Sequence, residues 1–251
     1  MKEPDKLIEL MNNPYTLDML RSASEENGLA VMRIISSCEL LEDAAGKNIS
    51  RRSKKYIETI RAMCRSILRN SAVNSAMAAD GDRVTLLRID RFAESVAAGC
   101  KHVLGDKLKI VINENSGAMV MTDPDVLRFF ILGTVRRIIT ASEGGRISIE
   151  MGTSCEDGCV RLSMRQIKDT PAPEPSYYRP ESFFDRNYRD ICKAVSDRLD
   201  ITIDAGKEGF VITMPEAKAD PAEMRMPFVY GDPGDFSYYR IMLDDTELDA
   251  D

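Results

Sequence analysis

Residues 122–150 read TDPDVLRFFILGTVRRIITASEGGRISIE, and this stretch decides how we interpret the rest of the chain. Asp123 and Pro124 predict the start of a helix, because an aspartate side chain can cap a first turn and proline suits a position whose N–H has no helical partner. The apolar residues that follow recur at helical spacing: Val126, Leu127, Phe130, Ile131, Val135 and Ile138. Two glycines at 144–145 end the predicted helix, and alternation in residues 146–150 predicts a half-buried strand.

The composition is ordinary for a globular protein. The chain has 251 residues, 43% hydrophobic and 30% charged, which is enough for one large domain or two smaller ones. No apolar run approaches the ~18 to 20 residues that span a bilayer, and the N-terminal sequence MKEPDKLIELMNN lacks the apolar core of a signal peptide. We therefore expect a cytoplasmic protein with no membrane insertion.

The cysteines indicate neither a disulfide framework nor a metal site. All six are scattered over predicted helices and strands, which favours reduced thiols. Cys155 and Cys159 form the only close pair, in the motif CEDGC. No second pair and only one histidine accompany them, so a plain hairpin turn is favoured over zinc, and we expect no metal.

The net charge lies in the C-terminal tail. Residues 216–251 contain ten acidic and three basic residues, which account for the whole net charge of −7. Residues 1–215 are therefore neutral and show no basic bias that would predict nucleic-acid binding.

Two heptad repeats before residue 80 predict an antiparallel helical hairpin. A turn at 45–48 separates them, and Ser50 can cap the second helix. Each repeat spaces its members alternately four and three apart: Leu20, Ser24, Asn27, Val31, Ile34, Cys38, Leu41, then Ile57, Ile60, Cys64, Ile67, Ser71, Asn74, Ala78. Two such faces are too long to be covered by each other alone, so we expect a dimeric four-helix bundle. The predicted interface comprises Leu20, Asn27, Val31, Ile34, Cys38, Leu41, Ile57, Ile60, Cys64 and Ile67.

Beyond a break at Asp80-Gly81-Asp82, alternating patterns predict an α/β domain. The expected strands are 84–89, 107–113, 118–121, 146–152, 160–166, 201–204 and 210–214, and the expected helices are 90–104, the central helix and 190–199. The fold class is therefore α+β. We expect four regions: an N-terminal helical extension (1–15), the hairpin (16–80), the α/β domain (81–215) and an acidic, aromatic tail (216–251).

The order of these motifs resembles the ATP-binding domain of sensor histidine kinases. The resemblance rests on DPDVLR and EGGRISI and covers roughly residues 16–215, with the hairpin where that family keeps its dimerisation hairpin. It implies a GHKL-type α/β sandwich after the hairpin. It also implies that the central helix should carry asparagines that hold nucleotide phosphates through magnesium, but Gly133 and Arg137 occupy those positions.

Other positions implied by the resemblance are also replaced. The phosphorylated histidine should fall at Ala23 or Ser24, and the only histidine of the chain, His102, is on another predicted helix. The adenine-binding aspartate and a following glycine are replaced by Gln166 and Lys168, and the sequence has no glycine-rich lid motif at the expected place. Because phosphoryl transfer needs these contacts together, we expect ATP and magnesium not to bind.

Three functions compete at this point. The first is a catalytically inactive, dimeric pseudokinase that binds or regulates a partner, such as a response regulator or a sensor kinase, in two-component-type signalling. The second is an unorthodox ATP-binding enzyme with residual ATPase activity or kinase activity on Ser24. The third, a phosphotransferase with a hairpin histidine, is opposed by Ala23 and Ser24.

The tail after Pro215 has two interpretations. It combines its acids with five aromatic residues and an apolar Ile-Met-Leu run at 241–243, so a docking segment competes evenly with simple disorder. As a docking segment it could bind Arg136, Arg137 and the vacated nucleotide pocket, the basic row of the second hairpin helix, or a partner.

Overall fold

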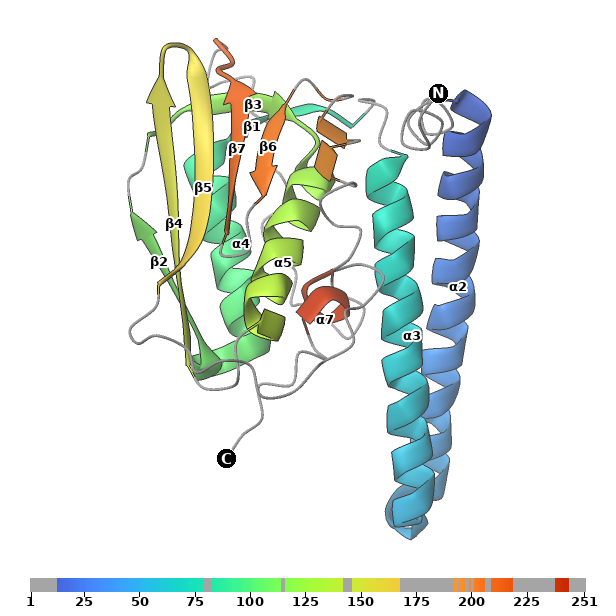
Figure 1. Cartoon of the computed structure of the whole chain (residues 1–251). Coiled ribbons are helices and arrows are strands. Elements are labelled where there is room, and N and C mark those ends of the chain that lie inside the picture. Colours follow the sequence, from blue (N-terminus) through green and yellow to red (C-terminus); the bar gives the residue numbers. More distant parts are fainter. Residues whose placement is uncertain are drawn as a thin grey trace. The chain divides into compact units, whose positions relative to one another are not determined.

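The computed structural model divides the chain into two units, Met1–Ala78 and Ala79–Asp251. It describes residues 13–78, 83–113, 116–141, 146–167, 201–205, 209–218 and 238–243, with five helical residues at 192, 193, 195, 196 and 199. The first unit contains a long helical hairpin, and the second contains sheets with helices packed on them (Figure 1). The expected α+β class, a hairpin followed by an α/β domain, is confirmed.

The hairpin consists of α2 (Pro14–Ala45) and α3 (Arg51–Met77), joined through the short helix η1 (Gly46–Asn48). Asn13 caps α2, because its Oδ1 accepts a hydrogen bond from the backbone N–H of Tyr15 at 3.0 Å. Ser50 caps α3 as predicted, with its Oγ accepting from the N–H of Ser53 at 3.0 Å. An ion pair of 2.6 Å between Arg61 and Glu42 joins the two helices near the η1 end.

The two heptad positions of each helix have different environments. Members of one series are buried: Ser24, Val31 and Cys38 on α2, and Ile57, Cys64 and Ser71 on α3. Members of the other series are exposed or half-buried: Leu20, Asn27, Ile34 and Leu41 on α2, and Ile60, Ile67 and Asn74 on α3. Val31 is 2% exposed and Ile34, three residues later, is 43% exposed. We call these the closed series and the open series.

The second unit contains a five-stranded sheet with the order β2-β4-β5-β7-β6. Its strands are β2 (Leu108–Asn113), β4 (Ile147–Glu156), β5 (Cys159–Ile167), β6 (Thr202–Ala205) and β7 (Gly209–Pro215). Strand β2 runs parallel to β4, and the other neighbours are antiparallel. A separate antiparallel pair consists of β1 (Thr85–Arg88) and β3 (Met119–Thr122).

Strands β2 and β3 are not neighbours, although only residues 114–118 separate them in the sequence. Strand β3 pairs with β1, and β2 takes β4 as its parallel partner after the chain has passed through a helix. A parallel pair requires such a crossover, and the apolar central helix supplies it. The connection therefore switches between two sheets.

Helices α4 (Ile89–Leu104) and α5 (Pro124–Ala141) pack on one face of the larger sheet (Figure 1). The short helix η2 (Gly105–Lys107) leads from α4 into β2. Alternate side chains of three strands are buried on the covered face: Ile147, Ile149, Met151, Val160, Leu162, Met164, Phe210, Ile212 and Met214. On α5 burial is not restricted to one stripe: Phe129, Phe130, Ile131, Leu132 and Val135 are all buried. A helix that is apolar on all sides needs cover on its outer side as well as from the sheet.

The strands β4 and β5 form the predicted hairpin around the CEDGC motif. Asp157 and Gly158 have φ of 52° and 73°, which is the left-handed backbone that a two-residue hairpin turn requires and that glycine adopts without strain. Cys155 lies opposite Val160, and Glu156 lies opposite Cys159. Successive residues of a strand point to opposite faces, so the two cysteines lie on opposite faces of the hairpin.

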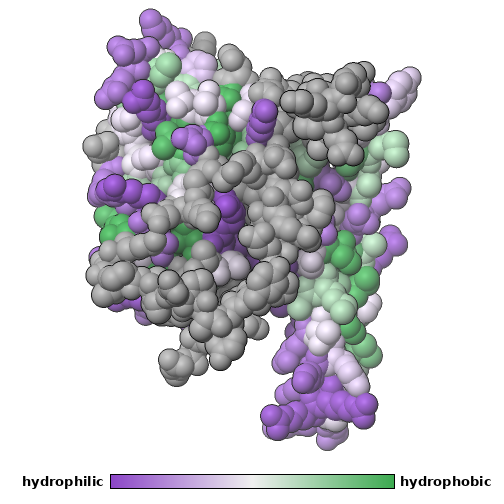
Figure 2. Space-filling view, viewed as in Figure 1, coloured by the Kyte–Doolittle hydropathy of each residue, from purple (hydrophilic) through white to green (hydrophobic). Residues whose placement is uncertain are grey.

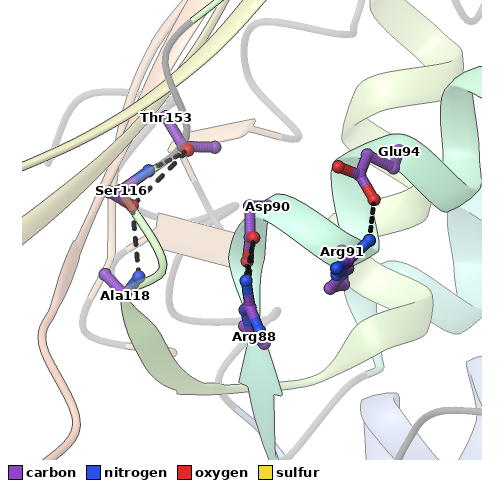
Figure 3. Close-up of polar contacts among 7 residues, drawn as sticks. All are labelled: Arg88, Asp90, Arg91, Glu94, Ser116, Ala118 and Thr153. Carbon is purple, nitrogen blue, oxygen red and sulfur yellow. Dashed lines mark hydrogen bonds and ion pairs between the residues drawn. The ribbon is translucent and has the colours of Figure 1, made fainter.

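Polar contacts fix the ends of elements around α4 (Figure 3). The Arg88 guanidinium donates to both oxygens of the buried Asp90 carboxylate, the closest contact being 2.8 Å. Bidentate pairing of this kind supplies the partner that a buried carboxylate needs. In the segment before β3, the backbone N–H of Ser116 donates to Thr153 on β4 at 3.2 Å.

Candidate functional site

Helix α5 is the element on which the candidate nucleotide site depends. Its start is fixed as predicted: Asp123 Oδ1 accepts hydrogen bonds from the N–H groups of Asp125 at 2.8 Å and Val126 at 3.3 Å. Burial raises the pKa of the Asp123 carboxyl above its ordinary value, and these two hydrogen bonds oppose the rise. The cap fixes the residue at which α5 begins.

The two positions expected to hold phosphate-binding asparagines lie on one face of α5. Gly133 is buried and Arg137 is half-buried. Residues three and four apart are neighbours on a helix surface, so Arg136 and Arg137 both flank Gly133. This face therefore has no side chain at Gly133 and carries two guanidinium groups one turn later. It offers no carboxamide oxygen that could bind a metal ion.

Gln166, expected at the adenine position, lies near the end of β5. It pairs with Ile149 on β4 and shares the strand face of the buried Val160, Leu162 and Met164, so it is on the side of the sheet that the helices cover. Lys168 and the following residues up to 191, which include the place of the expected lid deletion, lie outside the described residues. So does the expected N-terminal extension up to residue 12.

The expected phosphoacceptor positions do not offer an accessible nucleophile. Ala23 is exposed but carries no reactive group. Ser24 belongs to the closed series and is buried; its hydroxyl donates to the Ser71 carbonyl at 2.8 Å and is 2.7 Å from the Ser75 hydroxyl. The Ser24 hydroxyl thus joins α2 to α3.

We next consider metal-ligating groups, thiols and membrane-spanning helices. Among the described residues, no group of three or more histidine, cysteine, aspartate or glutamate side chains could hold a metal ion. All six cysteines are free thiols. Within the described part of the chain no helix is long and apolar enough to cross a membrane.

The tail contributes a helix to the second unit. Helix α7 (Tyr238–Leu243) packs against both α4 and α5 (Figure 1). Its Tyr239, Met242 and Leu243 are buried, and Arg136 donates a 3.0 Å hydrogen bond to the backbone carbonyl of Met242. Docking of the tail on the chain's own α/β unit at Arg136, one of the two interpretations left open, is confirmed for these residues.

One residue of this contact, Gly99, was not predicted from the sequence. At Gly99 on α4, a Cβ atom would overlap the ring of Tyr239, so only glycine leaves room for the ring where it lies. A glycine in the interior of a helix costs roughly 0.5–1 kcal/mol relative to alanine, which suggests a packing reason for it. That signal could have indicated a close approach, although it could not have identified Tyr239.

Comparisons with known proteins return histidine kinases at low identity. No family model and no curated protein sequence matches the chain. The structure of the histidine kinase AdeS of Acinetobacter baumannii is 14% identical, covers 74% of this chain and 94% of its own, and gives a TM-score of 0.48. The histidine kinase ThkA in complex with the response regulator protein TrrA is 14% identical, with 86% and 64% covered and a TM-score of 0.48. A histidine kinase from Burkholderia phymatum is 9% identical, with 77% and 97% covered and a TM-score of 0.37. At these identities and TM-scores the likeness assigns no role to any residue of this chain.

Proposed function

We propose that the chain is a dimeric, non-catalytic pseudokinase of the histidine-kinase type, which binds or regulates a partner in two-component-type signalling without transferring phosphate. Its proposed partners are a response regulator or a sensor kinase, and nucleic acid is not among them. The order of a helical hairpin followed by an α/β unit supports this proposal, together with the DPDVLR and EGGRISI motifs at the two ends of α5.

The observation that carries the proposal is the environment of Ser24. A phosphoryl acceptor must present a nucleophile that the donor can approach in line. The Ser24 hydroxyl is buried and satisfied by Ser71 and Ser75 across the hairpin, so a phosphate there would have to separate α2 from α3. The exposed neighbour Ala23 has no nucleophile.

The nucleotide positions support the same conclusion. Gly133 supplies no ligand, and the fixed positive charge of Arg137 repels a divalent cation at the place where the resemblance implies magnesium. We therefore propose that ATP with magnesium does not bind.

The open series supports the dimer. Ile34 and Ile60 are 43% and 40% exposed, and Leu41 and Ile67 extend the same series along the two helices. Figure 2 shows apolar side chains reaching the surface along the hairpin, whose tip is hydrophilic. A large apolar strip of this kind typically marks a protein–protein contact, and a second copy of the hairpin offers the same strip with matching spacing.

The decisive experiment is a calorimetric titration with ATP and magnesium, performed on the unmodified protein and on Arg137→Asn. We expect binding to neither, because restoring one asparagine leaves Gly133 and Gln166 unchanged. Magnesium-dependent binding to the unmodified protein would support the alternative, an unorthodox ATP-binding enzyme with residual ATPase or kinase activity. Radiolabel transfer that disappears in Ser24→Ala would assign that activity to Ser24. Tight binding by Arg137→Asn alone would show that the pocket is otherwise intact.

A further inference from the structure

We infer that the sides of α4 and α5 that contact α7 form a binding site for short amphipathic helices, and that α7 is its resident, exchangeable ligand. We call this surface the docking face; Gly99 and Arg136 are its two defining residues. The biological role of this exchange rests on the proposed partner-binding function, because the exchange has a consequence only if a helix of a partner can replace α7.

The apolar part of the docking face recognises a defined pattern. Tyr239, Met242 and Leu243 are spaced i, i+3 and i+4, so they lie on one side of α7, and all three are buried. Gly99 admits the aromatic ring by leaving out a side chain. A replacement helix must therefore carry an aromatic residue followed by apolar residues three and four positions later. This is the usual anchor pattern of a helix bound in a hydrophobic groove.

The polar part of the docking face recognises backbone. The last carbonyls of a helix lack partners within the helix, and a cation near that end is favoured by the helix dipole. Arg136 is 8% exposed and donates to the carbonyl of Met242, the penultimate residue of α7. Because the acceptor is a backbone oxygen, Arg136 can hold the C-terminal end of a helix whose sequence differs from that of α7.

Helix α7 has the properties of a ligand rather than a framework element. It has six residues, and a helix this short is not stable without its packing surface. Helix α7 is covalently joined to the rest of the unit, since it follows β7 in the same chain. Tethering gives α7 a high effective concentration, and a free helix must compete with it.

The first test uses a fluorescent peptide with the sequence of residues 236–245, FSYYRIMLDD, added to full-length variants. Tyr239→Ala with Met242→Ala should empty the docking face, and Arg240→Ala on the same helix is the matched control, since Arg240 is half-buried and outside the anchor triad. We expect the peptide to bind the double variant at least tenfold more tightly than the unmodified protein or the control. Adding Gly99→Leu to the double variant should abolish that binding.

If the double variant keeps the circular dichroism spectrum of the unmodified protein and still binds the peptide no better, the inference is wrong.

The second test covers the case in which the double variant does not fold. In the unmodified protein, amide hydrogens of α7 should exchange at least tenfold faster than those of α5 and β5, because an exchangeable helix opens without global unfolding. Equal protection of α7 and α5 would make α7 a permanent part of the core and overturn the inference.

A titration of the same variants with ATP and magnesium separates the two proposals. Nucleotide binding after the docking face is emptied would contradict the proposed non-catalytic function, whereas the peptide and exchange results alone decide the docking face.

Discussion

The two units expose apolar helix surface to different extents. In the hairpin the open series leaves Ile34 and Ile60 accessible. In the α/β unit the outer side of α5 is covered by α7, which the chain supplies from its own tail. An apolar helix surface needs cover in both units. In the α/β unit the chain itself supplies that cover, and for the open series we propose that a second copy of the hairpin supplies it. Apolar helix surface is therefore covered in one unit and accessible in the other, at defined positions.

The largest effect is expected in the closed series. Val31→Asp buries a charge with no partner between α2 and α3, which should cost about 4 kcal/mol or more and unfold the hairpin. Hydrogen exchange across residues 14–77 measures the loss. The exposed Ser36→Asp on the other side of α2 is the control and should keep the protection of the unmodified protein. Unchanged protection in Val31→Asp would show that the closed series does not hold the hairpin together.

The next effect is expected in the open series. Ile34→Asp combined with Ile60→Asp should produce a monomer that keeps its helical content, because each burial of a side chain of this size contributes ~1.5–3 kcal/mol only when a partner covers it. Analytical sedimentation with circular dichroism measures both quantities, and Ser36→Asp should remain dimeric. If the unmodified protein is only monomeric at micromolar concentration, the proposed dimer is wrong.

In the α/β unit, Gly99→Ala should destabilise by about 1–3 kcal/mol, because the new Cβ overlaps the Tyr239 ring. Tyr239→Ala removes the ring, so adding Gly99→Ala to it should cost nothing further or gain helix propensity. Urea unfolding of the two single variants and the double variant gives the coupling. Additive effects would mean that Tyr239 does not depend on the space at Gly99.

The smallest effect is expected at Glu150 on β4, whose side chain lies on the face of the sheet opposite to the one that the helices cover. Hydrogen bonds from Arg165 and Asn113 lower the pKa of its carboxyl below the ordinary value of 4.5. A lowered folded-state pKa stabilises above the unfolded value, and this stabilisation is lost as the pH falls below 4.5. Glu150→Gln should therefore flatten the acid side of the stability profile slightly. Urea midpoints at a pH of about 3.5 and of about 7 measure it; equal slopes would exclude a role for this pair.

The elements that depend on local chemistry could be predicted from the sequence. The caps at Asp123 and Ser50, the Asp-Gly turn at 157–158 and the helical and strand periods all follow from neighbouring residues, and the structure confirms them. The resemblance in DPDVLR and EGGRISI likewise suggested where Gly133 and Arg137 should lie on α5. These features could be predicted because hydrogen bonds and backbone angles within a few residues decide them.

The partner of each apolar surface could not be predicted from the sequence and is known from the three-dimensional structure. A heptad repeat contains two apolar positions, and the sequence does not distinguish the closed member Val31 from the open member Ile34. Nor does it show that β2 pairs with β4, or that Tyr239 lies over Gly99. Each of these depends on residues far apart in the chain, because periodicity specifies that a face must be covered but not which segment covers it.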